Sequence, residues 1–555
     1  MNRILSRNDI QNRIAKGQTI LIYDHQVLRL DKWIAYHPGG AKAIYHMVGR
    51  DCTDEMNSYH CETTQATFKK FRVGKIDYKW ENMLPPIQGG KYTFIEEKKA
   101  NNDDDNHCDS DDTLIGDDNL MDKDQHSKLP GQPAVEIIPP IPQNMIFTID
   151  KKFAYQQKVI RDPEDVLDNY DNQFVEKDLQ MYPPMDYETQ SELSEKYNQL
   201  HQRIIDANLY QCDYWSYFKE FCRIGSLFLW SMIFYKTNHL FCSAVAIGAA
   251  WQQSTFIVHD AAHISITHNY QFDSFIGMTI ASFVGGLSST WWKSNHNVHH
   301  LVTNDPVHDP DIQHLPFFAV STKLFKNVYS TYYEKFLYYD KFSKLVIRIQ
   351  DHLYYPMLGF GRFNLYRLSW THLLLGLGPT KGKAAWFRWY ELVGLSFFSY
   401  WFFYLFLFKC LDSPGQRWQY LLVSHISTML VHVQITLSHF PMSTSDLGVS
   451  ESFPSKQMRT TMDVDCPEWF DFIHGGLQFQ AIHHLFPRLP RHNLRKAQPY
   501  VIAFCKDVGL KYTIYGFAKG NGKVLSRLGK IAQQAKILAD CTKAMKEEAR
   551  GTSRK

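Results

Sequence analysis

The sequence predicts two folded parts: an N-terminal α+β domain, and behind it an all-α membrane domain with about four transmembrane helices. Residues 1–78 read as a small domain of short strands and helices, whereas the aromatic residues, 15% of the 555, concentrate in the second half. That half also holds apolar segments approaching the roughly 20 residues that cross a bilayer. The formal net charge of +3 gives no general reason to expect a nucleic-acid partner.

Four apolar segments are expected to form two membrane hairpins. Residues 224–235 and 240–258 flank one polar break, and residues 389–408 and 420–437 flank another. The first segment is the weakest of the four, and a large soluble core of buried helices is the alternative. Residues 275–287 are apolar but short and contain glycines, which favours a re-entrant or interfacial segment over a full span.

Three further regions have compositions of their own. Residues 79–184 contain Pro pairs and a tract, 101–126, with ten Asp against one Lys, so we expect a largely disordered linker. The membrane domain is assigned to 185–515 and opens on an amphipathic helical stretch, 185–220. In the tail, 516–555, basic residues dominate, and either a solvated basic helix or a lipid-binding helix fits.

The sequence also predicts which side of the membrane the domains face. Ten scattered cysteines without a C-x-x-C pair suit reduced thiols. The N-terminus lacks the apolar stretch of a signal peptide, so the first domain should stay in the cytosol. Because the spans are paired, His259 and His439, at the ends of the two hairpins, should emerge on the same side.

Two histidines in residues 1–78 predict a haem. His37 begins an H-P-G-G turn that lets its imidazole project, and His60 follows 23 residues later, after a helical stretch. Two opposed imidazoles give a six-coordinate iron suited to electron transfer. With the intervening G-R-D sequence, residues 5–77 resemble cytochrome b5, which implies haem b with His37 and His60 as axial ligands.

Histidines also gather in three groups that follow the apolar segments. They are H-D-A-A-H with His259 and His263, H-N-V-H-H with His296, His299 and His300, and Q-A-I-H-H with Gln480, His483 and His484. On a helix these spacings place the side chains on one face. One such pair can arise by chance, but seven histidines on one predicted membrane face indicate a metal centre.

The metal is predicted to be a pair of iron ions. Seven imidazoles are too many for one ion, and no cysteine has the spacing of a zinc site. Imidazole suits iron, and a haem domain that delivers single electrons implies redox chemistry. Two irons can activate O2 to take hydrogen from an unactivated C–H bond.

The histidine groups match the three boxes of membrane desaturases fused to cytochrome b5, over residues 1–78 and about 185–515. The Gln of the third box is typical of this fused group, of front-end and sphingolipid Δ8 type. The resemblance implies that the box residues bind the irons and that His439 adds a ligand. Gln480 would bind iron or hold a water that does, and His474 is a weaker candidate. Asp260 could orient an imidazole, and Asp309 and Asp311 could do the same or bind a polar group of the substrate.

The stretches 27–40 and 54–60 are most similar to fungal sphingolipid Δ8 desaturases. This implies an O2-dependent reaction that introduces a double bond at carbon 8 of the long-chain base of ceramides. Electrons would come from NADH–cytochrome b5 reductase through the haem. The protein would be a multi-pass protein of the endoplasmic reticulum membrane, with haem and boxes on the cytosolic side. The alternatives are a front-end acyl-lipid desaturase, a lipid hydroxylase, or a membrane electron carrier in which the box histidines do nothing.

Overall fold

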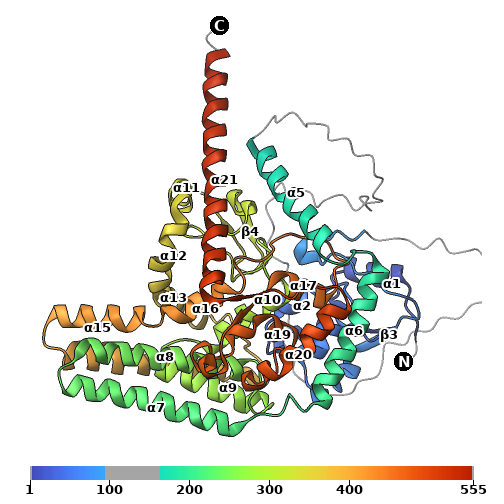
Figure 1. Ribbon diagram of the computed structural model, residues 1–555. Coiled ribbons are helices and arrows are strands. Elements are labelled where there is room, and N and C mark those ends of the chain that lie inside the picture. Colours follow the sequence, from blue (N-terminus) through green and yellow to red (C-terminus); the bar gives the residue numbers. More distant parts are fainter. Residues whose placement is uncertain (1–2, 94–162, 553–555) are drawn as a thin grey trace, which may run out of the picture. The chain divides into compact units, whose positions relative to one another are not determined.

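The structure is a computed structural model that describes residues 3–93 and 163–552 (Figure 1). Its N-terminal domain has a three-stranded antiparallel sheet in the order β1-β2-β3, formed by Ile20–Tyr23, Gln26–Arg29 and Arg72–Lys75. Asp24 and His25 join the first two strands with φ of 45° and 59°, the left-handed conformation of a two-residue type I′ hairpin turn. The prediction of a small α+β domain is confirmed.

Short helices precede the sheet and connect its second and third strands. They are α1 Arg7–Ala15, η1 Ile34–Tyr36, α2 Ala41–Tyr45, α3 Thr53–Tyr59, α4 Glu62–Gln65 and η2 Phe68–Phe71. The domain core holds Leu5, Ile10, Ile22 and Val27, all inaccessible to solvent. A further turn, η3 Pro86–Gln88, follows the third strand.

The packing of this domain continues beyond the boundary predicted after residue 78. Trp80 and Met83 are buried in that core, and the Trp80 indole donates to the carbonyl of Gly49 at 3.1 Å. At its other end the expected linker contains α5, Pro163–Met181, whose Leu167 is buried. At both ends of the expected linker, apolar residues among the charged ones pack against the folded parts of the chain. The Asp-rich tract lies outside the described residues.

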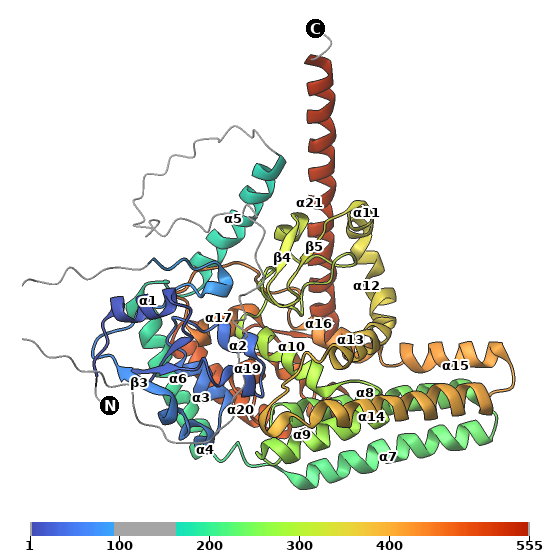
Figure 2. The same ribbon diagram turned by 180° about the vertical axis from the view of Figure 1, so that it is seen from behind.

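The membrane part begins after the amphipathic helix α6, Tyr187–Asp206, which buries Leu193, Tyr197, Leu200 and Ile204. Among the described residues, three helical segments are long and apolar enough to cross a membrane: Leu240–Ala262, Gly382–Cys410 and Pro414–Leu437. Helix α7, Tyr214–Lys236, has the length of a span but not the apolar character, and it packs along α8, Leu240–Ala262, as the first expected hairpin (Figures 1 and 2). The segment at 275–287 is no span, since α9, Tyr270–Met278, continues only into a short π-helix, η4 Thr279–Val284.

The second hairpin is built from α14 Phe387–Phe398, extended by the π-helix η8 Ser399–Cys410, and from α15 Pro414–Ile426 and α16 Met429–Leu437. Gly248 of α8 lies where α15 crosses it. A Cβ there would meet the carbonyl oxygen of Ser424 at 2.4 Å, so only glycine permits this close approach.

The remaining elements form the part that carries the histidine groups. They are α10 Ser289–Leu301, η5 Thr322–Phe325, β4 Val328–Ser330, β5 Lys335–Leu337, α11 Lys341–Val346, η6 Ile347–Ile349, α12 Gln350–Gly359, α13 Gly361–Leu375, η7 Gly382–Ala384, α17 Phe453–Thr460, β6 Asp463–Asp465, η9 Glu468–Phe470, α18 Asp471–His474, η10 Leu477–Phe479, α19 Gln480–Leu485, α20 Arg491–Asp507, β7 Ile514–Gly516 and α21 Phe517–Thr552.

The basic tail is a helix, α21, but its first half is not solvated. Val524, Leu528 and Ile531 are completely buried, and the helix packs on α12 and α5. These apolar residues recur at helical spacing, which the net charge of the tail conceals. The interpretation as a solvated basic helix was therefore wrong for this half.

Candidate haem and metal sites

The two histidines of the N-terminal domain face each other across a gap. The rings of His37 and His60 have centroids 6.3 Å apart. Each ring holds its Nδ1 on a backbone carbonyl, His37 on Gly40 at 2.9 Å and His60 on Met56 at 3.0 Å. This leaves the Nε2 atom of each ring free for an iron between them. Burial lowers the pKa of His37 to about 4 and that of His60 to about 3, so both imidazoles are neutral.

The loops that carry these histidines contact the helices that carry the histidine boxes. The amide of Asn297 on α10 donates to the carbonyl of Gly39 at 3.2 Å. The hydroxyl of Ser58 donates to the carbonyl of Leu485, directly after the third box, at 2.7 Å. Tyr59, next to His60, lies edge-on to His300 with ring centroids 6.0 Å apart. Helices α2 and α10 lie side by side in Figure 2.

The three histidine boxes converge from three separate parts of the chain. The first lies at the end of α8, the second on α10 and the third on α19. At Gly475, φ is +58° and a Cβ would meet the Phe256 ring at 2.0 Å, so this glycine lets the turn before the third box pack against α8. His439 follows α16 and adds an eighth imidazole to the set.

The imidazoles form two groups, and a third set, His296, His299 and Asp311, joins one imidazole of each group with a carboxylate. The ligating atoms of each group lie within 4.8 Å of one another: His259, His263, His296 and His483 in the first, and His299, His439 and His484 in the second. His300 lies between the groups. Its Nε2 is 2.9 Å from that of His296, and its ring stacks on that of His484 with centroids 4.1 Å apart.

Most of these rings point an unsatisfied nitrogen at their neighbours. Within this set, six buried ring nitrogens have no hydrogen-bond partner among the described residues: Nε2 of His259, His263, His483 and His484, and Nδ1 of His300 and His439. A buried polar atom without a partner is costly, so an arrangement of this kind is explained by a bound ion. Burial lowers the pKa of most of the set, to about 3 for His296 and well below the usual value for His263, His300, His439, His483 and His484. Neutral imidazole is the form that binds metal.

Two carboxylates support the second box. Nδ1 of His299 donates to Asp309 at 2.8 Å, and Asp309 is completely buried. Asp311 lies 3.6 Å from Nδ1 of His296 and 3.8 Å from that of His299. Burial alone would lower the pKa of His299, but the charges of these two carboxylates raise it above its usual value.

A buried ionic cluster supports the first box. Asp260 lies 3.5 Å from Nδ1 of His259 and accepts from the guanidinium of Arg491 at 2.7 Å and from the Tyr217 hydroxyl. Arg491 also pairs with Glu220 of α7. The sequence pointed to Asp260 but not to Arg491, which is 231 residues away and belongs to no motif.

Gln457 of α17 joins the second and third boxes. Its amide donates to the carbonyl of His300 at 2.8 Å, and its carbonyl accepts from Nδ1 of His484 at 2.9 Å. No spacing in the sequence indicated it. Gln480 is buried at the start of α19, one turn before His483. His474 lies apart from both groups, with its Nδ1 on Gln434 at 3.2 Å.

Comparison with known proteins agrees with this geometry. A fatty acid desaturase model matches residues 237–516, and a cytochrome b5-like haem/steroid binding domain model matches residues 6–77. This chain belongs to the fatty acid desaturase family. The Delta 8-(E)-sphingolipid desaturase of Kluyveromyces lactis is 60% identical over 553 residues, covering 100% of this chain and 96% of that protein. That of Candida albicans is 57% identical, covering 98% of each. The acyl-lipid (9-3)-desaturase of Borago officinalis is 37% identical over 64% of this chain and 78% of that protein.

As a desaturase with a cytochrome b5-like domain, the protein is a membrane oxidoreductase that uses haem and iron. The residues present fit both groups. His37 and His60 leave a gap with both Nε2 atoms free, and six of the eight imidazoles of the metal site carry a buried nitrogen without a partner. The predicted family and cofactor classes are confirmed.

Proposed function

We propose that this protein introduces a double bond of E geometry at carbon 8 of the long-chain base of sphingolipids. The observation that carries the proposal is identity of 57 to 60% along the full chain with relatives named Delta 8-(E)-sphingolipid desaturase. The acyl-lipid relative is 37% identical over 64% of the chain, which places a front-end acyl activity second.

We further propose that the two imidazole groups hold one iron each. The first group offers four imidazoles and the second three, with His300 between them and Gln480 one turn before His483 as candidates for the remaining positions. When bound, such a pair supplies the O2-dependent oxidation that removes two vicinal hydrogens from a saturated chain. The chain's own part is to fix the imidazoles. Asp309 holds the tautomer of His299, and Gln457 holds that of His484.

Electrons reach this centre, in our proposal, from NADH–cytochrome b5 reductase through the haem held by His37 and His60. The contacts of Gly39 with Asn297 and of Ser58 with Leu485 support the last step, since both haem-ligand loops then lie on box helices. The three apolar helical segments and reduced cysteines fit a multi-pass protein of the endoplasmic reticulum with its haem domain in the cytosol.

The test is mass spectrometry of long-chain bases and fatty acids from a host that lacks this unsaturation. Expression should yield a base lighter by two hydrogens, with the new bond at carbon 8 and E geometry. His37→Ala and His299→Ala should abolish the product, whereas His352→Ala should not, because the His352 side chain is 82% exposed.

Other outcomes would move the assignment. A new double bond in fatty acids with unchanged bases indicates an acyl-lipid desaturase. A base that gains oxygen indicates a hydroxylase. Activity that survives both His37→Ala and His299→Ala contradicts the roles of haem and boxes together, and refutes the proposal.

A further inference from the structure

Lys293 of α10 is a cation without a carboxylate partner. Burial lowers the pKa of its ammonium to about 8, and the charge of Asp273 opposes this shift, so the group stays charged at neutral pH. Within the described residues its hydrogen bond goes to the carbonyl of Ala262, and it forms no ion pair. The ammonium has three donors, and a buried charge is costly unless it is paired. An anion from outside the polypeptide would complete its surroundings.

Asp273 of α9 does not pair with Lys293, because its carboxylate is already engaged. Asp273 is completely buried, and its two oxygens accept from the backbone N–H of Thr267 at 3.0 and 3.1 Å. The Thr267 hydroxyl donates to the same carboxylate. Asp273 therefore compensates the charge of Lys293 only from a distance, where the Coulomb interaction is weaker.

The loop that carries His37 lies along the face of α10 that presents Lys293. Pro38, the residue after His37, lines one small cavity together with Lys293 and Ser294. Asn297, which donates to this loop as described above, is four residues after Lys293 and so shares its face of the helix. Lys293 therefore meets the haem domain at the loop of one axial ligand.

The charge of Lys293 acts on both predicted haem ligands. Burial is the main cause of the lowered pKa of His37 and of His60, and the positive charge of Lys293 adds to it in each. A charge that acts on both rings lies near the gap between them. Arg488, just after the third box, acts on His60 in the same sense. The side of the gap that faces the box helices is therefore positive.

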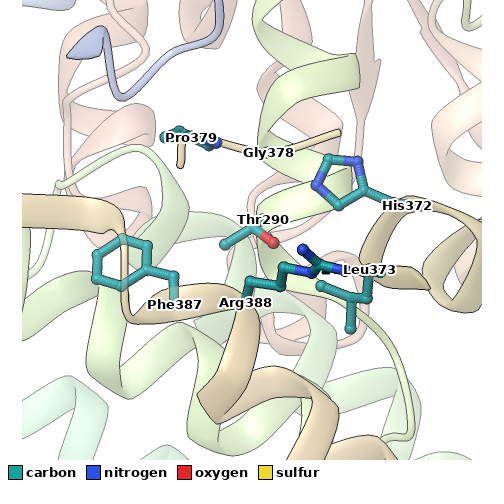
Figure 3. Close-up of a pocket in the computed structure, with 7 residues that line it drawn as sticks. All are labelled: Thr290, His372, Leu373, Gly378, Pro379, Phe387 and Arg388. Carbon is teal, nitrogen blue, oxygen red and sulfur yellow. Dashed lines mark hydrogen bonds between the residues drawn. The ribbon is translucent and has the colours of Figure 1, made fainter. Parts of the chain in front are cut away.

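The start of α10 fixes where Lys293 lies. Glu391 of α14 is completely buried and accepts from the backbone N–H groups of Ser289 and Thr290 at 2.6 and 3.2 Å. Thr290 and Phe387, at the start of α14, line one small pocket (Figure 3). Lys293 follows within the next turn of the helix. A cation held by ordered elements loses little conformational entropy when it binds an anion.

Haem b carries an anion of the kind that Lys293 lacks. Its ring is largely apolar, and its charged groups are propionate carboxylates at one edge, so these lie at the rim of the gap between His37 and His60. A carboxylate that leaves bulk water is stabilised by a charge-assisted hydrogen bond from an ammonium. Both the position of Lys293 beside the His37 loop and its positive charge fit such a carboxylate.

We propose that the Lys293 ammonium binds a propionate carboxylate of the haem. The helix of the second histidine box then holds the cofactor of the N-terminal domain directly, and the haem lies at the junction of the two domains. The inference rests on the proposed role of His37 and His60 as haem ligands, and it adds a residue of the desaturase domain to the haem site.

The test compares haem b with its dimethyl ester, in which the carboxylates are blocked, on the purified full chain in lipid nanodiscs. The measured quantity is the rate at which each haem leaves for an excess of apomyoglobin, followed by absorbance. The wild type should lose the ester about 10-fold faster than haem b, the effect of one hydrogen bond between charged groups. In Lys293→Met this ratio should fall about 10-fold, because removing the second partner of a contact changes little once the first is gone. Lys293→Arg keeps the charge and should retain most of the ratio.

Lys496→Met is the control. Lys496 is exposed on α20, where its ammonium donates to Asn493 at 3.1 Å, so this variant should show the wild-type ratio. Equal loss of the two haems from the wild type, or a ratio that is unchanged in Lys293→Met, overturns the contact. The wild type alone decides the first of these outcomes, so the test does not depend on whether the variant folds.

Failure of the contact and failure of the ligand assignment give different results. If the wild type has the absorbance of a haem with two imidazole ligands but loses both haems at one rate, the ligands stand and the Lys293 contact is wrong. If His37→Ala binds haem b with the absorbance of the wild type, the ligand assignment on which the inference rests is itself wrong.

Discussion

Replacing Asp309 with Asn should weaken iron binding although Asp309 touches no metal. The carboxylate is completely buried and has three hydrogen bonds. Oδ2 accepts from Nδ1 of His299 at 2.8 Å and from the backbone N–H of Asn304 at 2.7 Å, and Oδ1 accepts from the backbone N–H of Asp311 at 2.8 Å. All three partners are donors, so both side-chain oxygens of residue 309 must act as acceptors.

Asn cannot meet that requirement in either orientation. With its NH2 group at the Oδ1 position it faces the N–H of Asp311, and with that group at the Oδ2 position it faces His299 and Asn304. In either orientation one buried donor–donor contact remains, and it should destabilise the site by about 1 to 3 kcal/mol. Loss of a carboxylate partner from a ligating histidine typically costs 10- to 100-fold in metal affinity, or about 1.4 to 2.8 kcal/mol. The two figures agree, and we expect a loss in this range.

The assay is iron content of the purified full chain after dialysis against a graded chelator. Asp446→Asn is the control, because Asp446 is exposed and its carboxylate accepts from the backbone of Gly448, outside the histidine groups, so its iron content should match the wild type. Haem absorbance reports folding of the N-terminal domain. Asp309→Asn protein that keeps its iron as the wild type does would refute the reasoning.

Three more outcomes are expected. Burial lowers the pKa of His37 to about 4 and that of His60 to about 3, so below pH 6.5 the unfolded state binds more protons than the folded state. Haem retention, followed by absorbance, should therefore be full above pH 6.5 and fall toward pH 4. A flat pH profile would contradict this. Arg491→Met removes the guanidinium that two buried carboxylates, Asp260 and Glu220, share and should cost about 3 to 5 kcal/mol, visible as a lowered thermal unfolding temperature. Asn297→Ala should slow haem reoxidation in stopped flow about 3- to 10-fold, whereas Lys69→Ala, which is exposed, should not.

The histidine positions could be predicted because helical spacing is local. Histidines three and four residues apart share a face whatever the rest of the fold does, so each box was visible by itself. The positions of Arg491 and Gln457 depend instead on how α20 and α17 pack against α8, α10 and α19, over separations of 231 and 157 residues. Such contacts leave no periodic signal in a single sequence.

The packing of residues outside the predicted domain limits was missed for a different reason. Charge and proline content describe a segment's average, but packing depends on single apolar residues within it. Trp80 lies in a polar stretch and still closes the haem domain, and Val524 and Leu528 fix a helix whose composition is basic. The first predicted span shows the opposite case, in which charged residues lie within a segment predicted from its apolar residues. Helix α7 has the full length of a span but carries charged residues, and one of them, Glu220, pairs with Arg491.

The contact between the haem domain and the boxes combines polar and apolar packing. Besides the two hydrogen bonds described above, the Tyr59 ring lies edge-on to Phe453, with ring centroids 6.5 Å apart, and Leu301 packs against the core of the haem domain. Each hydrogen bond contributes only about 0.5 to 1.5 kcal/mol. Attachment to the same chain adds an effective concentration in the millimolar range, at which even a weak contact is well populated. Both axial-ligand loops therefore lie on the helices of the second and third boxes, which is the arrangement that the proposed electron transfer from haem to the metal centre requires.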